Sequence, residues 1–375
     1  MRRGENIYKR KDGRWEGRYI RYYTPDKKAK LGYIYGKSYN EVKRNLHMLK
    51  STTNPEIAHL PSPAVPYHKI LDDWLQSLHS KTTESTTAHY GYLISCHIRP
   101  RLGGYCISKI TTAMIELFVV QLLDDGRLDG QGGLAAKTVT DILAIIKATM
   151  DYARHQNYPV SCDLRRVSVK AHRKEMRVLT PEEQKSLVTT LLTDTDLCKL
   201  GVLLSLYTGI RIGELCALKW ENIDLTASTL SIRQTMQRIQ NTSPTATSKT
   251  KVIFTQPKSQ SSLRDIPLPS FMAEILGPFA GTPQAYILTG SPNRHMEPRT
   301  VQNHFRKIIQ ASGLAPANFH ALRHTFATRC VEVGFEIKSL SEILGHSSVN
   351  ITLERYVHSS MELKKNNMQL LKLNL

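Results

Sequence analysis

Two linkers divide this 375-residue chain into three segments with different residue patterns. Residues 60–66 are rich in proline, and the stretch from Tyr158 to Arg177 is strongly basic. A proline-rich stretch stays extended and separates folded regions, and a chain of this length exceeds one typical domain. We therefore predict a multidomain α+β protein with domains at 1–55, 64–160 and 175–375.

The first segment combines positive charge with aromatic residues. Residues 1–50 hold 15 Lys/Arg against 5 Asp/Glu, a net +10 of the chain's +19. Aromatic runs at 13–22 and 30–36, bounded by turn residues, predict strands. Ser38 and Glu41 then form a capping box that opens a helix with Val42, Leu46 and Leu49 on one face. A small basic sheet backed by a helix suits a reader of a DNA groove; the alternative is a small structural domain with solvated charges.

The middle segment has the periodicity of helices. A first helix is expected directly after the proline-rich linker at 60–66, and further helices are expected at 83–98, 111–123 and 136–156. The apolar stripe of that first helix consists of Tyr67, Ile70, Leu71, Trp74, Leu75 and Leu78. We predict an all-helical domain whose lysines and arginines either contact phosphates or are ordinary solvated charges.

Charge and cysteine usage limit the class of partner. A net charge of +19 and a pI near 9.7 favour a polyanion. No apolar run approaches the roughly 18 residues of a membrane span, and the N-terminus lacks the apolar core of a signal peptide. Nucleic acid is therefore the expected partner rather than a membrane. The six cysteines include no C-x-x-C pair, so we expect reduced thiols in a cytoplasmic protein. A basic but inert surface is the alternative.

The third segment mixes helices and strands. Thr180, Pro181 and Glu183 predict a capped helix start. Helices are expected at 181–192 and 195–207, strands between 230 and 268 with a polar loop at 240–250, and helices again from 299 onward. This predicts a mainly helical domain with a small antiparallel sheet.

Two islands of polar residues in this segment suit phosphate chemistry. In Thr208–Leu215 the glycines permit a tight turn and close approach of the backbone to a ligand, while Arg211 starts a helix and Glu214 orients it. Residues 256–268 are interpreted as a hairpin with Lys258 near its turn, where a lysine can protonate a departing alkoxide. A solvated hairpin lysine is the alternative for Lys258.

Two further islands follow near the end of the chain. His320 and Arg323 are three apart and share a helical face, and a cation at that spacing argues against zinc. His324 is expected to pack or to face elsewhere. A straight helix would place His346 and Tyr356 about 15 Å apart, so the turn after Gly345 must redirect the chain if both serve one site.

Taken in this order, the islands resemble the tyrosine recombinase (phage integrase) family. The resemblance rests on T-G-x-R-x-x-E, a hairpin lysine, H-x-x-R, L-G-H and a following tyrosine, and it is strong over about 175–360. More weakly, the middle segment resembles the family's core-binding domain. Residues 1–50 resemble the three-stranded arm-binding domain of integrases from conjugative transposons of Gram-positive bacteria.

The resemblance implies a mechanism and a set of site residues. Tyr356 would attack a DNA phosphate, giving a 3′-phosphotyrosine and a free 5′-hydroxyl, without ATP, metal or other cofactor. The two arginines would neutralise the phosphate, His346 would add a hydrogen bond, His320 would serve as base and Lys258 as acid. The implied catalytic residues are Arg211, Lys258, His320, Arg323, His346 and Tyr356.

The implied partners are double-stranded DNA with core-type and arm-type sites, a homotetramer on that DNA, and an excisionase or DNA-bending protein. The place of action would be the bacterial cytoplasm, at the nucleoid. Integration and excision of a mobile element is the favoured function. A resident chromosome-resolution recombinase, a type IB topoisomerase and a non-catalytic DNA-binding regulator are the alternatives. The apolar tail at 361–375 would dock on a neighbouring protomer or cover its own core, and the sequence favours neither.

Overall fold

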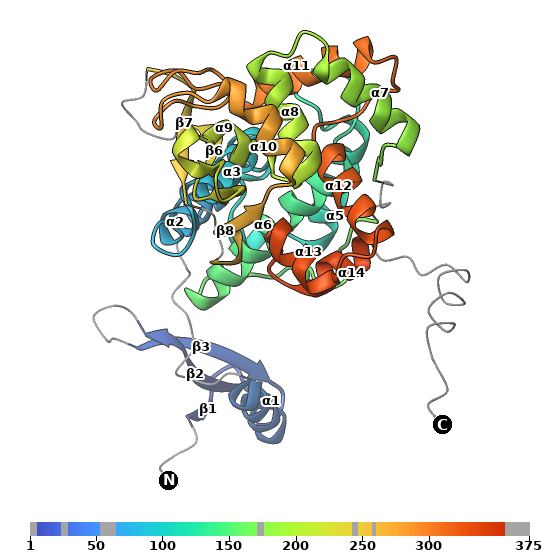
Figure 1. Cartoon of the computed structure of the whole chain (residues 1–375). Helices are drawn as coiled ribbons and strands as arrows, with labels where there is room; N and C mark the ends of the chain where they lie inside the picture. The colour runs from blue at the N-terminus through green and yellow to red at the C-terminus, as the bar shows by residue number, and fades with distance from the viewer. Residues whose placement is uncertain are drawn as a thin grey trace, which may run out of the picture. The chain divides into compact units, whose positions relative to one another are not determined.

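The computed structural model describes residues 6–23, 29–52, 65–170, 176–241, 247–256 and 260–356 (Figure 1). The chain forms two compact units: Met1–Thr82 with Tyr90–Ala171, and Thr83–His89 with His172–Leu375. The first holds a small antiparallel sheet and a set of helices, and the second is mainly helical with two small sheets. The predicted fold class is confirmed, whereas the three domain boundaries stay a prediction.

The N-terminal sheet lies on one helix. Its strands β1 (Ile7–Lys9), β2 (Trp15–Tyr23) and β3 (Ala29–Gly36) pair antiparallel in that order, and α1 (Tyr39–Thr52) follows. A side chain at Gly17 would collide with Val42 and Leu46, so this glycine lets the helix approach the sheet. The predicted cap is present in part: Ser38 Oγ accepts from the amide of Glu41 at 3.2 Å, but the Glu41 carboxylate accepts from the amide of Lys37.

The helices of the first unit follow the predicted pattern. They are α2 (Tyr67–Ser77), α3 (Glu84–Leu93), a π-helical turn (Ile94–Ile98), α4 (Arg99–Leu102), α5 (Thr112–Asp125) and α6 (Ala136–His155). The first part of α3, within Thr83–His89, is grouped in the second unit. Their core includes the predicted Tyr67, Ile70 and Leu71, all fully buried. The buried Tyr67 hydroxyl is hydrogen-bonded to Thr149 at 2.6 Å, which satisfies both polar groups.

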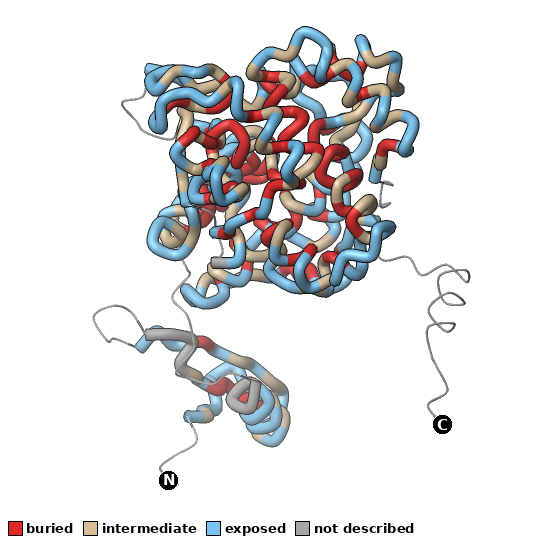
Figure 2. The backbone as a smooth tube through the Cα atoms, viewed as in Figure 1, coloured by how far each residue is buried: buried red, intermediate tan, exposed pale blue. Residues whose placement is uncertain are grey.

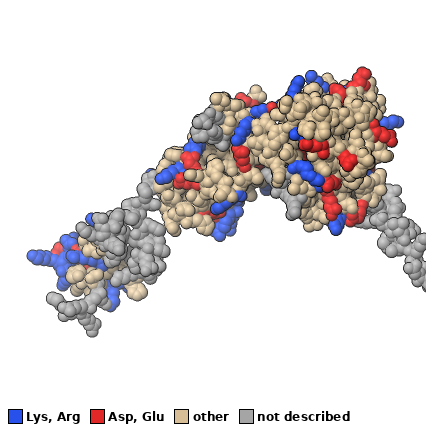
Figure 3. All heavy atoms as spheres, turned by 60° about the vertical axis from the view of Figure 1, so that its left-hand side comes forward, with Lys and Arg blue, Asp and Glu red and all other residues tan. Residues whose placement is uncertain are grey.

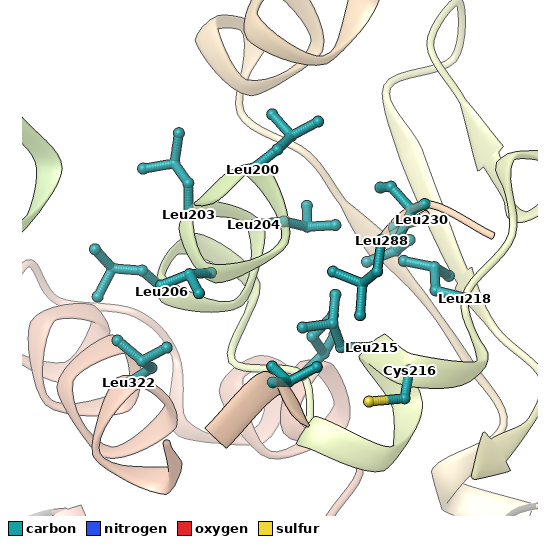
Figure 4. Packing of buried hydrophobic residues seen from close by; sticks show 14 of the residues in the cluster. Leu200, Leu203, Leu204, Leu206, Leu215, Cys216, Leu218, Leu230, Leu288 and Leu322 are labelled. Atoms are coloured by element: carbon teal, nitrogen blue, oxygen red, sulfur yellow. The ribbon is translucent and has the colours of Figure 1, made fainter. Parts of the chain in front are cut away.

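The second unit is built around α8 (Leu197–Thr208), nine of whose 12 residues are buried; Figure 2 shows the buried parts of the backbone in red. Leucines of α8 interdigitate with Leu215, Leu288 and Leu322 from other elements (Figure 4). The capping box of Thr180 and Glu183 opens α7 (Pro181–Leu192) as predicted. The remaining helices are α9 (Ile212–Ala217), α10 (Ser270–Leu276), α11 (Pro298–Ala311), α12 (His320–Glu332), α13 (Ile337–Leu344) and α14 (Val349–Tyr356).

The strands of this unit correct one prediction. β4 (Ile223–Asp224), β5 (Thr229–Ile232) and β8 (Arg264–Pro267) form one sheet, while β6 (Thr235–Gln240) pairs with β7 (Thr250–Thr255) in another. The hairpin is therefore β6–β7, and the predicted hairpin over 256–268 is wrong. Among the described residues, 256 and 260–263 instead belong to the connection from β7 to β8, because β8 pairs with β5.

Candidate active site

The turn from α8 into α9 places Arg211, and two glycines let the chain fold closely there. Gly209 has φ +65°, and a Cβ on it would lie 2.6 Å from Phe326. A Cβ on Gly213 would lie 2.7 Å from the carbonyl oxygen of Met236 in β6. These glycines thus permit close approach of protein to protein. We expected the backbone at these glycines to approach a ligand. Instead, the space beside Gly209 is filled by Phe326 and the space beside Gly213 by β6.

A buried carboxylate organises two arginines beside this turn. Glu214, 3% exposed, accepts hydrogen bonds from Nη1 of Arg211 at 2.8 Å and from the Arg211 amide at 2.9 Å. Arg264 of β8, also buried, donates to both Glu214 oxygens at 3.1 and 2.8 Å. Burial alone would raise the pKa of Glu214, but hydrogen bonds and charge from Arg264 hold it below its ordinary value. Glu214 is therefore ionised and orients Arg211, as predicted.

Three arginines converge on the C-terminal end of α13. Arg264 Nε donates to the carbonyl of Ile343 at 2.6 Å, Arg323 Nη2 to that of Leu344 at 2.7 Å, and Arg211 Nη2 to that of Gly345 at 3.0 Å. The last carbonyls of a helix have no partner within the helix and carry partial negative charge. The three guanidinium groups satisfy them and so fix the turn that leads to His346. Because the donors lie on β8, on α12 and at the N-cap of α9, three elements are joined at this point.

Four of the six predicted site residues surround one cavity of about 280 Å³. Its lining comprises Arg211, Ser262, His320, Arg323, Gly345, His346, Ser347, Ile351 and Arg355. The charges of Arg323, Arg211, Arg355 and Arg264 all act on His346, and Glu214 supplies a negative charge near Arg323. Burial, which disfavours the charged form, and next the positive charge of Arg211 lower the pKa of Arg323 to about 9. Such a cavity favours an anion of the size of a phosphate.

Tyr356 lies next to this cavity and is 6% exposed. Gly345, at φ +63°, ends α13, and the chain turns back into α14. The rings of His346 and Tyr356 consequently stack with centroids 6.4 Å apart, which confirms the predicted change of direction. The Tyr356 ring packs in a small cluster separate from the main core, which we call the tyrosine cluster. Its buried members are Ala327, Cys330, Leu340, Leu344 and Tyr356.

Sequence reasoning missed two residues of this region. His324 was expected to pack or to face elsewhere; it is buried, but its Nδ1 lies 2.9 Å from the Tyr356 hydroxyl. Its position four residues after His320 was a signal, since i and i+4 share a helical face. Arg264 lies two residues before the buried Ile266 and therefore on the same face of β8, and that spacing was the signal for a buried arginine.

Lys258 lies outside the described residues. Among those described, no group of three or more His, Cys, Asp or Glu side chains is placed to hold a metal ion, and all six cysteines are free. No helix in the described ranges is long and apolar enough to cross a membrane. The tail at 361–375 also falls outside the described residues.

A second candidate site is the sheet face opposite α1. Arg18 and Tyr33 are cross-strand neighbours, and the Arg18 guanidinium lies 4.9 Å from the Tyr8 ring centre and 5.7 Å from that of Tyr33. The buried Glu16 carboxylate accepts from Arg18 and from Arg10. These tyrosines are about half exposed, and lysines and arginines stand on the described surface of this segment (Figure 3). An ordered array of aromatic rings and guanidinium groups on an open sheet suits contact with nucleic acid.

Two family models match this chain. Residues 177–362 match the phage integrase family, and residues 67–123 match the N-terminal SAM-like domain of phage integrases. A relative described as a XerC-like tyrosine recombinase, from Caldanaerobacter subterraneus subsp. tengcongensis, is 26% identical over 299 residues. That alignment covers 72% of this chain and 73% of the relative.

Two solved structures share the fold. The Tn1549 transposon integrase in complex with a circular intermediate DNA is 19% identical with a TM-score of 0.65, over 82% of this chain and 100% of that one. The lambda integrase tetramer bound to a Holliday junction is 20% identical with a TM-score of 0.57, over 97% of this chain and 100% of that one. The similarity therefore extends well beyond the part that surrounds the cavity.

Proposed function

Since the chain belongs to the tyrosine recombinase (phage integrase) family and is a DNA strand-cleaving and strand-joining enzyme, we propose that it integrates and excises a mobile genetic element through a 3′-phosphotyrosine intermediate. The observation that carries the chemistry is the cationic cavity beside Tyr356. The observation that favours a mobile element is the second candidate site on the N-terminal sheet, which would give the enzyme a second class of DNA site.

Phosphate recognition falls to the cavity arginines. A phosphodiester resists nucleophiles because it is anionic, and charge builds on its non-bridging oxygens during attack. Arg211 and Arg323 donate from planar forks that fit these oxygens, and His346 adds a hydrogen bond from the same wall. Removing one such preorganised donor typically costs about 3–4 kcal/mol of transition-state stabilisation.

Covalent chemistry falls to Tyr356 and its proton-transfer partners. The phenol oxygen attacks phosphorus, the bond to the 5′ oxygen breaks, and the energy of that bond is kept in the phosphotyrosine ester. Lys258 protonates the leaving 5′ oxygen, and His320, which lines the cavity, assists loss of the phenolic proton. The 5′-hydroxyl of a second DNA then attacks the ester, so neither ATP nor a metal is needed.

Tyr356→Phe tests the assignment of the nucleophile. The variant should bind core-site DNA like the unaltered chain but form no covalent adduct on a nicked suicide substrate, because only the hydroxyl is lost. Denaturing electrophoresis of labelled DNA measures the adduct. Tyr207→Phe is the control, since Tyr207 lies in α8 and contacts Phe271. A normal adduct yield from Tyr356→Phe would refute the assignment, and no adduct from the unaltered chain would favour a non-catalytic regulator.

The genetic role is tested by the DNA around the gene. A mobile-element integrase should be flanked by attachment-site repeats and transfer genes, and purified enzyme should join the two element ends in a plasmid assay. The XerC-like relative favours the alternative of a resident chromosome-resolution recombinase. That alternative predicts a single recombination site near the replication terminus and no repeats at the gene.

Assembly is proposed to be tetrameric on DNA, with an excisionase or DNA-bending protein setting direction. The lambda integrase tetramer on a Holliday junction, which shares this fold, supports the proposal. Sedimentation with a four-way junction made from the core site should give four chains per junction. Complexes limited to two chains on that substrate would contradict it.

A further inference from the structure

The contact between His324 and Tyr356 has no part in the roles above. His324 Nδ1 and the Tyr356 hydroxyl oxygen lie 2.9 Å apart, and both residues are buried, 7% and 6% exposed. Their rings are inclined at 47° with centroids 5.7 Å apart, so the contact runs through the polar atoms rather than through stacked faces. His324 thus reaches the atom that attacks phosphorus.

The other two histidines of the region are placed differently. His346 stacks parallel to the Tyr356 ring, and its Nδ1 is hydrogen-bonded to Thr352 Oγ1 at 2.8 Å. His320 lines the cavity, and its ring packs edge-on against that of His324 with the ring centroids 4.6 Å apart. Among the described residues, His324 is therefore the histidine whose ring nitrogen is within hydrogen-bond distance of the phenol oxygen.

Both groups of this contact are neutral near neutral pH. Burial, and then the charges of Arg355 and Arg323, lower the pKa of His324 to about 4, so its imidazole is neutral near neutral pH. Burial raises the pKa of Tyr356 despite the charges of Arg323 and Arg355, so its hydroxyl keeps its proton. A neutral imidazole has one acceptor nitrogen, and a neutral phenol has one proton to donate. In the tautomer whose proton is on Nε2, the phenol donates to Nδ1.

We propose that His324 is a catalytic residue whose Nδ1 aims the Tyr356 hydroxyl and accepts its proton as the phenol oxygen bonds to phosphorus. This rests on the proposed function and replaces His320 as the base, leaving His320 to face the phosphate. The bond from phosphorus to the 5′ oxygen breaks in the same step, and that oxygen takes its proton from Lys258. In strand joining, the imidazolium returns the proton to the departing phenol oxygen.

Bound DNA makes this transfer easier. The positive charges of Arg323 and Arg355 disfavour an imidazolium in the empty site. A phosphodiester in the cavity lined by those same arginines brings a negative charge that offsets theirs. His324 is therefore a stronger base when a phosphate is present, which restricts loss of the phenolic proton to the DNA-bound enzyme.

The test combines shape-conserving variants of His324 with an acidified nucleophile. His324→Phe keeps a ring but has no acceptor, and it should slow single-turnover adduct formation by about 100-fold or more without weakening DNA binding. Incorporating a fluorinated tyrosine at position 356, whose phenol ionises below neutral pH, should restore the rate to within a few-fold of the unaltered chain. A purely structural role predicts no such restoration.

Further variants keep the proposal falsifiable if His324→Phe folds poorly. His324→Asn places an amide near the position of Nδ1 that accepts a hydrogen bond but not a proton, and it should show a smaller loss with the same restoration by fluorotyrosine. His304→Asn on the exposed side of α11 is the control. Unchanged adduct formation in both His324 variants, or restoration specific to His320→Phe, would overturn the proposal. Absence of adduct in the unaltered chain would instead overturn the proposed function.

Discussion

At the scale of single residues, Glu214 is the group on which the others depend. It is a buried carboxylate between two guanidinium groups and accepts four hydrogen bonds. Two come from Arg211, which they hold at the cavity, and two come from the buried side chain of Arg264. A buried ion pair contributes little net stability when complete, but removal of one partner leaves an uncompensated charge in the interior. The side chain of Arg264 is only 5% exposed, so water does not reach it easily.

Glu214→Gln should therefore lower the free energy of unfolding by about 3 kcal/mol and abolish measurable adduct formation. The amide keeps the shape but leaves the buried charge of Arg264 without a counter-ion. Urea unfolding followed by circular dichroism measures the first effect, and the suicide substrate the second. Glu221→Gln is the control, because Glu221 is exposed and its ion pair with Lys219 is long, at 3.9 Å. Equal unfolding midpoints for the two variants would contradict the argument.

His324 also makes stability depend on pH. Its pKa is about 4 in the folded chain and about 6.5 when exposed. Between these values the unfolded chain binds a proton that the folded chain does not, so the free energy of unfolding falls as pH drops from about 6.5 to about 4. His346, whose pKa burial lowers to about 3, acts in the same direction. Unfolding midpoints between pH 4.5 and 7.5 should show a shallower pH slope for His324→Phe; parallel slopes would contradict this prediction.

The sequence was informative about which residue types form the site and less so about their contacts. The order of the islands identified Arg211, His320, Arg323 and His346, which the fold brings to one cavity. The role of His324 depends on where the turn after Gly345 returns Tyr356, a distance that no local pattern contains. The catalytic roles themselves, including that of Lys258, remain predictions.

At the scale of elements, α14 is held by a small patch of apolar contact. Tyr356 at its end packs in the tyrosine cluster with residues of α12 and α13, apart from the large core around α8. A helix of eight residues has little stability of its own and depends on such packing. The nucleophile is thus carried on an element that can loosen without unfolding of the main core.

Leu340→Ala should show this independence. Leu340 is fully buried in the tyrosine cluster, and such truncations cost about 2–5 kcal/mol. We expect faster amide hydrogen exchange in residues 349–356 and reduced adduct formation, with little change in the midpoint of global unfolding. Leu204→Ala, equally buried but in the main core, should instead lower the global midpoint. The same pattern of exchange in both variants would show that the two clusters unfold together.

Strand pairing was the part of the element structure that the sequence did not predict. Periodicity identified strands between 230 and 268 but not their partners. The predicted hairpin joined consecutive runs, whereas β7 pairs back to β6 and β8 pairs with β5. The choice is set partly by tertiary contact: Gly213 of α9 packs against the backbone of β6. A glycine at the second position of a six-residue helix gives no sign of its distant neighbour in the sequence.

At the scale of the whole molecule, charge and chemistry are separated along the chain. The first 50 residues carry more than half of the net charge, but the proposed catalytic residues begin at Arg211. The two candidate DNA-contacting sites are built from different segments, each with its own packing. DNA binding through the sheet and cleavage at the cavity should therefore be separable by substitution.

Arg18→Ala should reveal the separation. It removes the guanidinium that lies between Tyr8 and Tyr33, so binding to DNA from the element ends outside the core site should weaken by about tenfold or more. Adduct formation on a short core-site substrate should be unchanged. Footprinting on long and short DNA measures both effects, and Arg44→Ala on α1 is the charge-matched control. Equal losses on the two substrates would mean that the sheet does not define a second class of site.

The arginines at the end of α13 have a consequence for how variants of this enzyme are interpreted. Arg211 and Arg323 line the cavity, yet each also donates to a carbonyl of the turn before His346. Truncating either arginine removes both a positive charge from the cavity and a hydrogen bond to the turn, so an inactive alanine variant has two explanations. Adding guanidinium ion at concentrations well below those that denature proteins offers a way to separate them. A small free cation can refill the charge in the cavity, but it is not tethered to α9 or α12 and cannot rejoin those helices to the turn.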